Sequence, residues 1–318
     1  MPAGADAQLS GTLDVSVCVV TKDRLPEMVR CLDGIAAQEG VRAEVVIVID
    51  DTSTQPVADA CRERAETMAF PVRVEVMHGT VAQRRNRAVE LAQAPLIAWT
   101  DSDCMPQPGW LAAGVVAFSD AEVGVVQGRT VSEPVDAGWW PATQEISGFS
   151  GIYETCNIFY RRAALLEAGG FDPSFGWFCE DTAAGLSVRR QGWDATFCAD
   201  AVVMHETLPG GPRWHIRRSR HYDQWNVLAR RYPEVRALFW QRWFLRRRDA
   251  YVVAAACGIA GSVVWRPALV AALPWLASRR PGRLTPTEVQ RAGALLAFDA
   301  ACCYALWRGS VKSRSVVL

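Results

Sequence analysis

Strand and helix patterns alternate over the first hundred residues, and this alternation constrains the fold more than any other feature of the 318-residue chain. Short apolar runs with the β-branched content of strands lie at residues 15–21, 43–50, 72–77 and 96–100. Amphipathic helical stretches lie between them: one at 25–38, one that follows the second strand and ends at about residue 67, and one at 81–93. Continuously apolar strands are typical of a parallel sheet that is covered by helices on both faces. The sequence therefore predicts an α/β fold with a mostly parallel sheet flanked by helices.

The net charge of zero is an average over two unlike parts of the chain. Residues 1–212 carry 15 basic and 29 acidic side chains, whereas residues 213–318 carry 19 basic and 5 acidic ones. After Gly210-Gly211-Pro212 the composition changes, and Arg alternates with aromatic residues and apolar runs. We therefore expect a flexible N-terminus over 1–13, a folded domain over 14–212, and a basic, apolar, helical extension over 213–318.

Half of the residues are apolar and 21% are charged, a balance that excludes wholesale disorder and a polytopic membrane protein. The ten cysteines form no C-x-x-C pair, and several lie in apolar runs, as Cys18 does. Such a pattern is typical of buried, reduced thiols. Residues 1–14 lack the basic start and apolar middle of a signal peptide. We therefore expect the chemistry on the cytosolic side.

Acidic pairs follow two of the predicted strands. Asp50-Asp51 comes directly after the second strand, and Asp101-Ser102-Asp103 comes after the fourth. Because ligands of open α/β sheets gather at the carboxyl ends of the strands, we expect both pairs at one edge. Neighbouring carboxylates favour an oxygen-preferring divalent cation such as Mg²⁺ or Mn²⁺, which can neutralise a diphosphate leaving group. The alternative is a solvated acidic turn, which is common for a D-x-D taken alone.

Further motifs follow in order along the chain. They are Thr21-Lys22-Asp23-Arg24, Ile49-Asp50-Asp51-Thr52-Ser53, Arg84-Arg85-Asn86-Arg87, Asp101-Ser102-Asp103, Gly169-Gly170-Phe171-Asp172, Glu180-Asp181 and Val202-Val203-Met204-His205-Glu206. In this order and spacing they resemble the motifs of family 2 glycosyltransferases with the GT-A fold. The resemblance covers roughly residues 13–210. It implies a Rossmann-like sheet with a nucleotide-sugar half at about 14–104 and an acceptor half at about 105–212.

The resemblance also implies a role for each matching residue of the nucleotide-sugar half. Thr21 and Asp50 would hold the base and ribose of the nucleotide, and Arg85 would close over that pocket. Asp101 would face the ribose and the metal, while Asp103 would ligate the metal directly.

In the acceptor half, Asp181 would be the catalytic base that takes the proton from the acceptor hydroxyl, and Glu180 would shape the acceptor site. An inverting, in-line displacement needs one carboxylate opposite the leaving diphosphate, and the charge of Glu180 can raise a neighbouring pKa. The alternative is acidic capping of a helix N-terminus. His205 would ligate the metal or the diphosphate, or else it is a satisfied histidine at a strand end.

Two further residues are candidates for contact with the acceptor, which would be a glycan, a lipid-linked sugar or a small molecule. Trp177 lies three residues before Glu180, and aromatic faces suit stacking on sugar rings, although Trp is also ordinary core material. Asn157 could hydrogen-bond a sugar hydroxyl or satisfy a buried backbone group.

Departures from the family pattern refine the expected reaction. Lys22-Asp23 stands where the family often has Tyr-Asn, so the base pocket is expected to differ. The Q-x-x-R-W motif of processive synthases is missing, which favours transfer of a single sugar. Inversion is the favoured outcome, with a retaining enzyme of the same fold or a binding-only relative as alternatives. A nucleotidyltransferase is disfavoured, because the loop after the first strand lacks the glycines of a phosphate loop.

The basic extension has several candidate partners. Arg217 and Arg218 could bind the donor diphosphate, or the Arg and Trp residues could contact an anionic membrane surface. Nucleic acid is not expected, because no binding motif accompanies the basic residues. The uncharged run 250–265 is shorter than the ~20 residues of a membrane span. We therefore expect interfacial or re-entrant helices at the cytoplasmic face of a membrane, with a soluble cap or a self-association face as the alternative.

Overall fold

The computed structural model describes residues 12–175 and 177–318, so residues 1–11 of the predicted flexible N-terminus lie outside the described residues. Contacts divide the chain into two units. The first comprises the described residues through Val135 together with Thr143–Thr207, and the second comprises Asp136–Ala142 and Leu208–Leu318. Residues 136–142 thus belong to the second unit, although they lie about 70 residues before the change in composition at Gly211.

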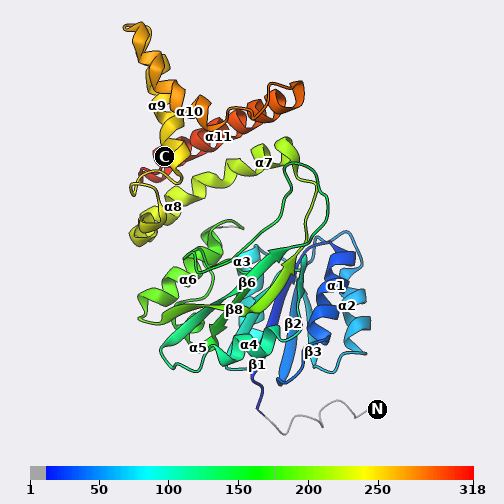
Figure 1. Ribbon diagram of the computed structural model, residues 1–318. Coiled ribbons are helices and arrows are strands. Elements are labelled where there is room, and N and C mark those ends of the chain that lie inside the picture. The colour runs from blue at the N-terminus through cyan, green and yellow to red at the C-terminus, as the bar shows by residue number, and fades with distance from the viewer. Residues whose placement is uncertain (1–11, 176) are drawn as a thin grey trace. The chain divides into compact units, whose positions relative to one another are not determined.

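One eight-stranded sheet forms the first unit, in the order β3-β2-β1-β4-β7-β6-β8-β5 (Figure 1). Its N-terminal half consists of β1 (Val15–Thr21), β2 (Ala43–Asp50), β3 (Val72–Met77) and β4 (Leu96–Thr100). β1 pairs in parallel with β2 and β4, and β2 pairs in parallel with β3. β1, β2 and β4 are buried almost throughout, as continuously apolar strands must be. The predicted α/β fold with flanking helices is confirmed.

Helices α1 (Leu25–Ala36), α2 (Val57–Ala65) and α3 (Val81–Leu91) cover the two faces of this parallel half. Val17 and Val19 of β1 belong to the same buried core as Leu32 of α1. On the other face, the Cys18 thiol lies 4.0 Å from the backbone carbonyl oxygen of Ala88 in α3. Successive residues of a strand point to opposite faces, so the uniformly apolar sequence of β1 supplies both layers.

The C-terminal half of the sheet is partly antiparallel, which the sequence analysis did not predict. Its strands are β5 (Cys104–Pro106), β6 (Val123–Ser132), β7 (Asn157–Arg161) and β8 (Asp194–His205). β7 runs antiparallel to β4 and β6, β6 runs parallel to β8, and β8 runs antiparallel to β5. The accompanying helices are α4 (Trp110–Val116), α5 (Arg162–Glu167) and α6 (Glu180–Arg190). The sheet as a whole is therefore mixed.

The second unit is helical, as predicted for the C-terminal extension. It contains α7 (Gly211–Ser219), α8 (Gln224–Arg231), α9 (Arg247–Gly261), α10 (Leu273–Ser278) and α11 (Pro286–Ser313). α11 begins after Thr285, whose hydroxyl accepts a hydrogen bond from the Glu288 backbone N–H at 3.3 Å. The last turns of α11 pack on α8. There a Cβ on Gly309 would lie 2.3 Å from Oδ1 of Asn226.

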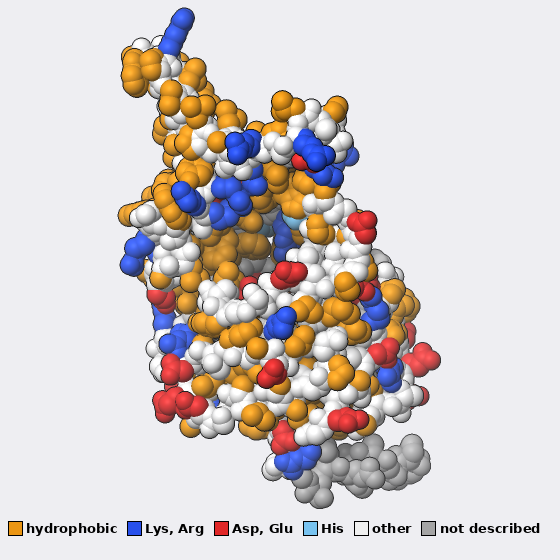
Figure 2. All heavy atoms as spheres, viewed as in Figure 1, with side chains coloured by type: hydrophobic (Ala, Val, Ile, Leu, Met, Phe, Trp, Pro, Cys, Tyr) orange, Lys and Arg blue, Asp and Glu red, His pale blue; other side chains and the backbone are white. Residues whose placement is uncertain are grey.

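Within this unit, α9 and the 3₁₀ turn η4 (Arg266–Ala272) form a close-packed hairpin. A Cβ on Gly258 would lie 2.5 Å from the carbonyl oxygen of Ala268, so glycine permits the approach. At the turn, Val263 and Val264 are 88% and 94% exposed, and hydrophobic side chains are plainly visible on the surface of the unit (Figure 2). Among the residues described, no helix has the length and apolar character needed to cross a membrane.

Candidate active site

The parallel strands bring three of the predicted donor residues to one edge of the sheet. Thr21 ends β1, Asp50 ends β2 and Asp101 follows β4, with β1 between the other two strands. The carboxyl ends of these strands therefore meet at the crevice where ligands of α/β sheets bind. Thr21 is 5% exposed, and its hydroxyl donates a hydrogen bond to the backbone carbonyl of Asp23 at 3.4 Å.

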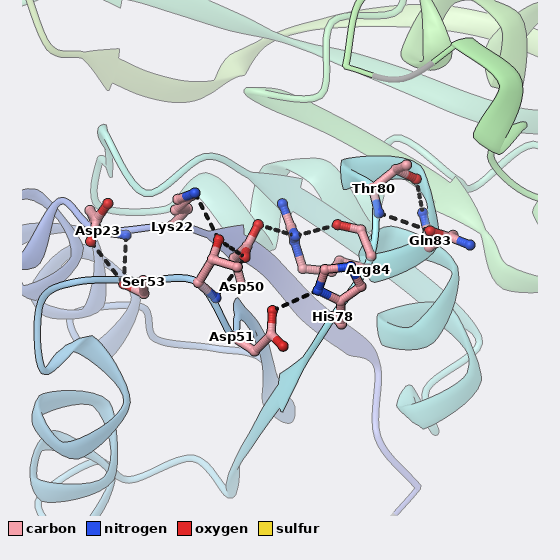
Figure 3. Close-up of polar contacts among 11 residues, drawn as sticks. Lys22, Asp23, Asp50, Asp51, Ser53, His78, Thr80, Gln83 and Arg84 are labelled. Atoms are coloured by element: carbon pink, nitrogen blue, oxygen red, sulfur yellow. Dashed lines mark hydrogen bonds and ion pairs between the residues drawn. The ribbon is translucent and has the colours of Figure 1, made fainter.

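A polar cluster surrounds Asp50 (Figure 3). Its carboxylate forms an ion pair with Arg84 and accepts hydrogen bonds from the Thr52 backbone N–H at 2.9 Å and the Thr52 hydroxyl at 2.5 Å. Lys22 Nζ donates to the same hydroxyl at 2.8 Å. Burial alone would raise the pKa of Asp50, but these hydrogen bonds and the charges of Arg84 and Lys22 hold it below its usual value. Asp50 is thus an ionised acceptor, suited to the N–H groups of a base or to ribose hydroxyls.

The arginine that pairs with Asp50 is Arg84 and not its neighbour Arg85, the residue predicted to close over the nucleotide pocket. The Arg84 side chain is 6% exposed and also donates to the Gly79 carbonyl at 2.7 Å. One step along a helix of 3.6 residues per turn rotates a side chain by about 100°. Adjacent arginines of α3 therefore face different carboxylates, and the motif alone does not tell which faces which.

The loop after β1 is held by a residue to which the sequence analysis gave no role. Asp23 Oδ1 accepts hydrogen bonds from the backbone N–H groups of Thr54 at 2.6 Å and Gln55 at 3.1 Å, and from the Ser53 hydroxyl at 3.1 Å. Asp23 and Arg24 both have positive φ, 56° and 60°, which non-glycine residues adopt when their surroundings impose it. Asp23 thereby ties the loops after β1 and β2 together, on either side of Asp50.

Asp103 and His205 lie together where β5 pairs with β8. His205 Nε2 is 3.8 Å from Asp103 Oδ2, and His205 Nδ1 is 2.7 Å from the Glu206 carbonyl oxygen. Because a carbonyl oxygen can only accept, Nδ1 is the donor of this hydrogen bond, and Nε2 is the ring nitrogen that faces Asp103. Asp103 also forms an ion pair with Arg24, which the sequence analysis did not assign.

In the described part of the chain, Asp103, Cys104 and His205 are the group whose ligand atoms lie close enough to hold a metal ion. Burial raises the pKa of Cys104 well above its usual value, so its thiol stays protonated. The carboxylate and the imidazole are therefore the candidate ligands. Burial also raises the pKa of the nearby Asp101, with Arg85 opposing the shift and Asp103 adding to it. Such mutual repulsion between carboxylates is what a divalent cation relieves.

Arg85 connects this donor edge to the N-terminus of α6. Its guanidinium forms an ion pair with Glu180 at 2.5 Å, lies 3.7 Å from Asp101, and donates to the Thr155 hydroxyl at 2.6 Å. The Glu180 side chain is 4% exposed. The Glu180 carboxylate faces Arg85 in the interior, and its predicted part in shaping the acceptor site stays a prediction. The closure of Arg85 over the nucleotide pocket likewise stays a prediction.

Asp181, the predicted base, follows Glu180 in the first turn of α6. Its pKa is raised to about 8, chiefly by burial and then by the charge of Glu180, while Arg85 acts in the opposite direction. One of its oxygens, Oδ1, accepts a hydrogen bond from the Thr182 backbone N–H at 2.7 Å. A carboxyl with this pKa can bind and release a proton near neutral pH.

Asn157 is fully buried, and the prediction that it contacts the acceptor is wrong. Its Nδ2 donates to the carbonyls of Arg129 and Ala201 at 2.8 and 2.9 Å, and its Oδ1 accepts from Trp110 Nε1 at 2.8 Å. The alternative interpretation, that Asn157 satisfies buried backbone groups, is confirmed.

The remaining predicted residues stay predictions. Trp177 is 42% exposed shortly before α6, as a sugar-stacking residue must be. Arg217 and Arg218 belong to α7 of the second unit, where the Arg218 guanidinium lies 5.2 Å from the centre of the Trp214 ring.

Comparison with known proteins gives a consistent picture. The family model described as glycosyl transferase family 2 matches residues 16–181. Glycosyltransferase AglE of Haloferax volcanii is 23% identical over 211 residues, which cover 62% of this chain and 68% of that protein. Pre-mycofactocin glycosyltransferase of Mycobacterium tuberculosis is 25% identical over 243 residues, which cover 70% of this chain and 49% of that protein. The chain thus spans about half to two-thirds of the length of these relatives.

A solved structure shares the fold. The mannosyltransferase PcManGT from Pyrobaculum calidifontis, in complex with GDP-Man and Mn²⁺, matches with a TM-score of 0.60 at 23% identity. The match covers 96% of this chain and 88% of that one.

Proposed function

Because the chain belongs to glycosyl transferase family 2, we propose that it transfers one sugar from a nucleoside-diphosphate sugar to an acceptor hydroxyl. The proposed transfer inverts the anomeric carbon and uses a divalent cation. The observation that carries this proposal is the position of Asp181. Its carboxyl can exchange a proton near neutral pH, and it is next to Glu180 in the sequence. Arg85 pairs with Glu180 and also lies 3.7 Å from Asp101 at the donor edge.

Asp181 is the proposed general base. It takes the proton from the acceptor hydroxyl as that oxygen forms a bond with the anomeric carbon. The bond between the anomeric carbon and the diphosphate oxygen breaks, and its electron pair leaves with the nucleoside diphosphate. A pKa of about 8 suits this role, since a base works best when its pKa lies near the working pH.

The donor nucleotide is proposed to bind at the ends of β1 and β2. Thr21 and the ionised Asp50 would contact the base and ribose, and Asp101 would face the ribose and the cation. Arg84 keeps Asp50 ionised and oriented. The bracing of the loop by Asp23 supports a preformed pocket, because two loops are tied together before any ligand binds.

The residues beside Asp103 fit an oxygen-preferring divalent cation. Asp103 and His205 would hold Mn²⁺ or Mg²⁺, with Asp101 beside them, and a bound cation would neutralise the leaving diphosphate. Imidazole is a better ligand for Mn²⁺ than for Mg²⁺. The presence of GDP-Man and Mn²⁺ in the mannosyltransferase structure supports this choice.

The acceptor is proposed to be a glycan, a lipid-linked sugar or a small molecule, with Trp177 stacking on a sugar ring. Arg217 and Arg218 are proposed as further contacts of the donor diphosphate. The missing motif of processive synthases supports transfer of one sugar at a time.

We also propose that the second unit binds peripherally to an anionic membrane at its cytoplasmic face. Residues 250–287 contain four Arg and no acidic residue, and the hairpin turn exposes Val263 and Val264. Apolar side chains beside Arg suit the boundary between headgroups and acyl chains.

The protein is expected to sediment with vesicles that contain anionic lipid and to be released by high salt. Val263→Glu with Val264→Glu should weaken this binding, whereas Val116→Glu, at a 71% exposed site of α4, should not.

The reaction is tested by incubating the protein with UDP-, GDP- and dTDP-sugars and measuring nucleoside diphosphate release. Release should stop with EDTA and return with Mn²⁺. Asp181→Asn should abolish transfer while leaving donor affinity within about threefold of the wild type, because the proposed role of Asp181 is to take the acceptor proton and not to bind the nucleotide. Normal transfer by this variant would remove Asp181 from the base role. The anomeric signal of the product in ¹H NMR separates inversion from retention.

A further inference from the structure

We propose that Arg85 is a positioning residue for sugar transfer, which holds the first turn of α6, and with it the Asp181 carboxyl, in register with Asp101 at the donor edge. The proposal rests on the assignment of Asp181 as the base. It replaces the role in nucleotide binding that the motif implied for Arg85.

The Arg85 side chain is buried inside the first unit. This residue is 5% exposed, and a guanidinium does not lose its proton in proteins. A buried charge persists only when it is paired and hydrogen-bonded. Arg85 meets this condition through the Glu180 carboxylate, the Thr155 hydroxyl and the more distant Asp101.

The partners of Arg85 come from separate parts of the fold. Asp101 follows β4, Thr155 lies shortly before β7, and Glu180 begins α6. The planar guanidinium presents its N–H groups in a rigid fork, so it fixes directions as well as distances. The ring of Phe171, with its centre 5.5 Å from Arg85 Cζ, packs beside this fork.

Arg85 acts on the orientation of Asp181 through Glu180. Glu180 and Asp181 are adjacent in the first turn of α6, so a contact that holds one backbone position also holds the other. The same turn is tied to the segment before β7 by the Thr182 hydroxyl, which donates to the Ile152 carbonyl at 2.7 Å. Arg85 adds the connection to the donor edge that this local contact does not supply.

The charge of Arg85 acts on Asp181 as well. The groups that act on Asp181 are Glu180 and Glu154, which raise its pKa, and Arg85 and the Thr182 backbone N–H, which lower it. Tyr160 is also close enough for Asp181 to raise its pKa. Loss of the Arg85 charge should therefore shift the ionisation of Asp181 to higher pH, and loss of the Glu180 charge should shift it to lower pH.

These opposite shifts distinguish positioning from a structural role alone. In Arg85→Gln, kcat at pH 7 should fall about 10- to 100-fold, KM for the donor should change less than about threefold, and the acid limb of kcat/KM should move upward by about half a unit or more. Glu180→Gln should move the acid limb downward. Arg85→Lys keeps the charge and loses the fork, so the limb should stay in place while kcat falls.

The matched control is Arg161→Gln. Arg161 is a part-buried arginine of the same sheet that donates to the backbone carbonyls of Phe118, Asp120 and Val123. This variant should leave the position of the acid limb unchanged. An unchanged limb in both Arg85→Gln and Glu180→Gln would overturn the proposal. So would a higher donor KM with normal kcat in Arg85→Gln, since that result would return Arg85 to nucleotide binding.

A second measurement needs no turnover and thus separates this proposal from the proposed function. The Asp181 carboxyl is titrated by ¹³C NMR, with Asp181→Asn identifying its signal. The wild type should titrate near pH 8, Arg85→Gln at higher pH and Glu180→Gln at lower pH. If transfer is absent but the pKa of Asp181 shifts as expected, the proposed function fails, while the influence of Arg85 and Glu180 on Asp181 stands. If transfer occurs without these pKa shifts, the positioning role fails. If Arg85→Gln does not fold, Arg85→Lys and Glu180→Gln decide by the same criteria.

Discussion

Replacement of Asn157 by Ala is expected to destabilise the first unit without impairing recognition of the acceptor. The register between β6 and β8 shifts after Gly128, whose partner is Cys198, while the next residue, Arg129, pairs with Val202. Asn157 donates to two backbone carbonyls at this irregularity and accepts a hydrogen bond from Trp110. Gly128 leaves space for this amide, because a Cβ there would lie 2.3 Å from Asn157 Oδ1.

The expected loss of stability follows from the three hydrogen bonds that Asn157→Ala removes. Each contributes about 1 kcal/mol net, and each buried partner left unsatisfied costs about 1–3 kcal/mol. We therefore expect the free energy of unfolding to fall by at least about 3 kcal/mol, which is large for a point substitution. Urea unfolding monitored by Trp fluorescence measures this change. A double-mutant cycle with Trp110→Phe should show a coupling of about 1 kcal/mol or more between the two side chains.

The acceptor assay provides the decisive contrast. Folded Asn157→Ala protein should keep its acceptor KM within about threefold of the wild type, because the amide is buried away from ligands. A loss of stability below 1 kcal/mol, or a tenfold rise in acceptor KM at normal stability, would refute this reasoning. The rise in acceptor KM would restore Asn157 as a sugar contact.

Three further predictions concern stability and reactivity. The pKa of Asp181 is raised from its ordinary value of 3.8 to about 8 in the folded chain, so the folded state binds the extra proton and loses stability as pH rises between these values. Asp181→Asn should therefore stabilise the protein at pH 9 by more than about 1.4 kcal/mol relative to pH 5, and equal effects at both pH values in urea unfolding would contradict this. Cys257 is the one exposed thiol of ten, so a single fast reaction with a thiol reagent is expected and should vanish in Cys257→Ser; a second fast thiol would disagree. Gly185→Ala should lower stability by about 1–3 kcal/mol in thermal unfolding, because its Cβ would lie 2.1 Å from the Tyr153 ring, whereas Gly148→Ala, with open space around it, should be nearly neutral.

The strands and helices of the parallel half could be predicted because their signals are local. Continuous apolar runs identify β1 and β4, and their observed bounds, Val15–Thr21 and Leu96–Thr100, equal the predicted ones. The cap at Thr285 was likewise predictable, since it depends on residues three positions apart. The antiparallel insertion of β7 between β4 and β6 had no such signal, because strand order depends on contacts between distant segments.

The strand-end acids could be predicted, but their partners could not. Parallel pairing with β1 in the middle brings the ends of β2 and β4 to one edge, so Asp50 and Asp101 were expected there from order alone. Arg24 beside Asp103 depends on the positive φ values of the loop, which the motif does not reveal. The burial of Glu180 and its pairing with Arg85 depend on where α6 packs, which the Glu180-Asp181 motif does not reveal.

The sequence by itself determined the α/β fold class, the family and the positions of the acidic residues along the chain. These follow from hydrophobic periodicity and from motifs, which are properties of neighbouring residues. Only the tertiary structure decided that Arg84 belongs to Asp50 and that Arg85 belongs to Glu180, 95 residues away. The physical reason is that an ion pair requires two side chains to point at one another. Their directions are set by helix phase and by the packing of separate segments, which no local pattern encodes.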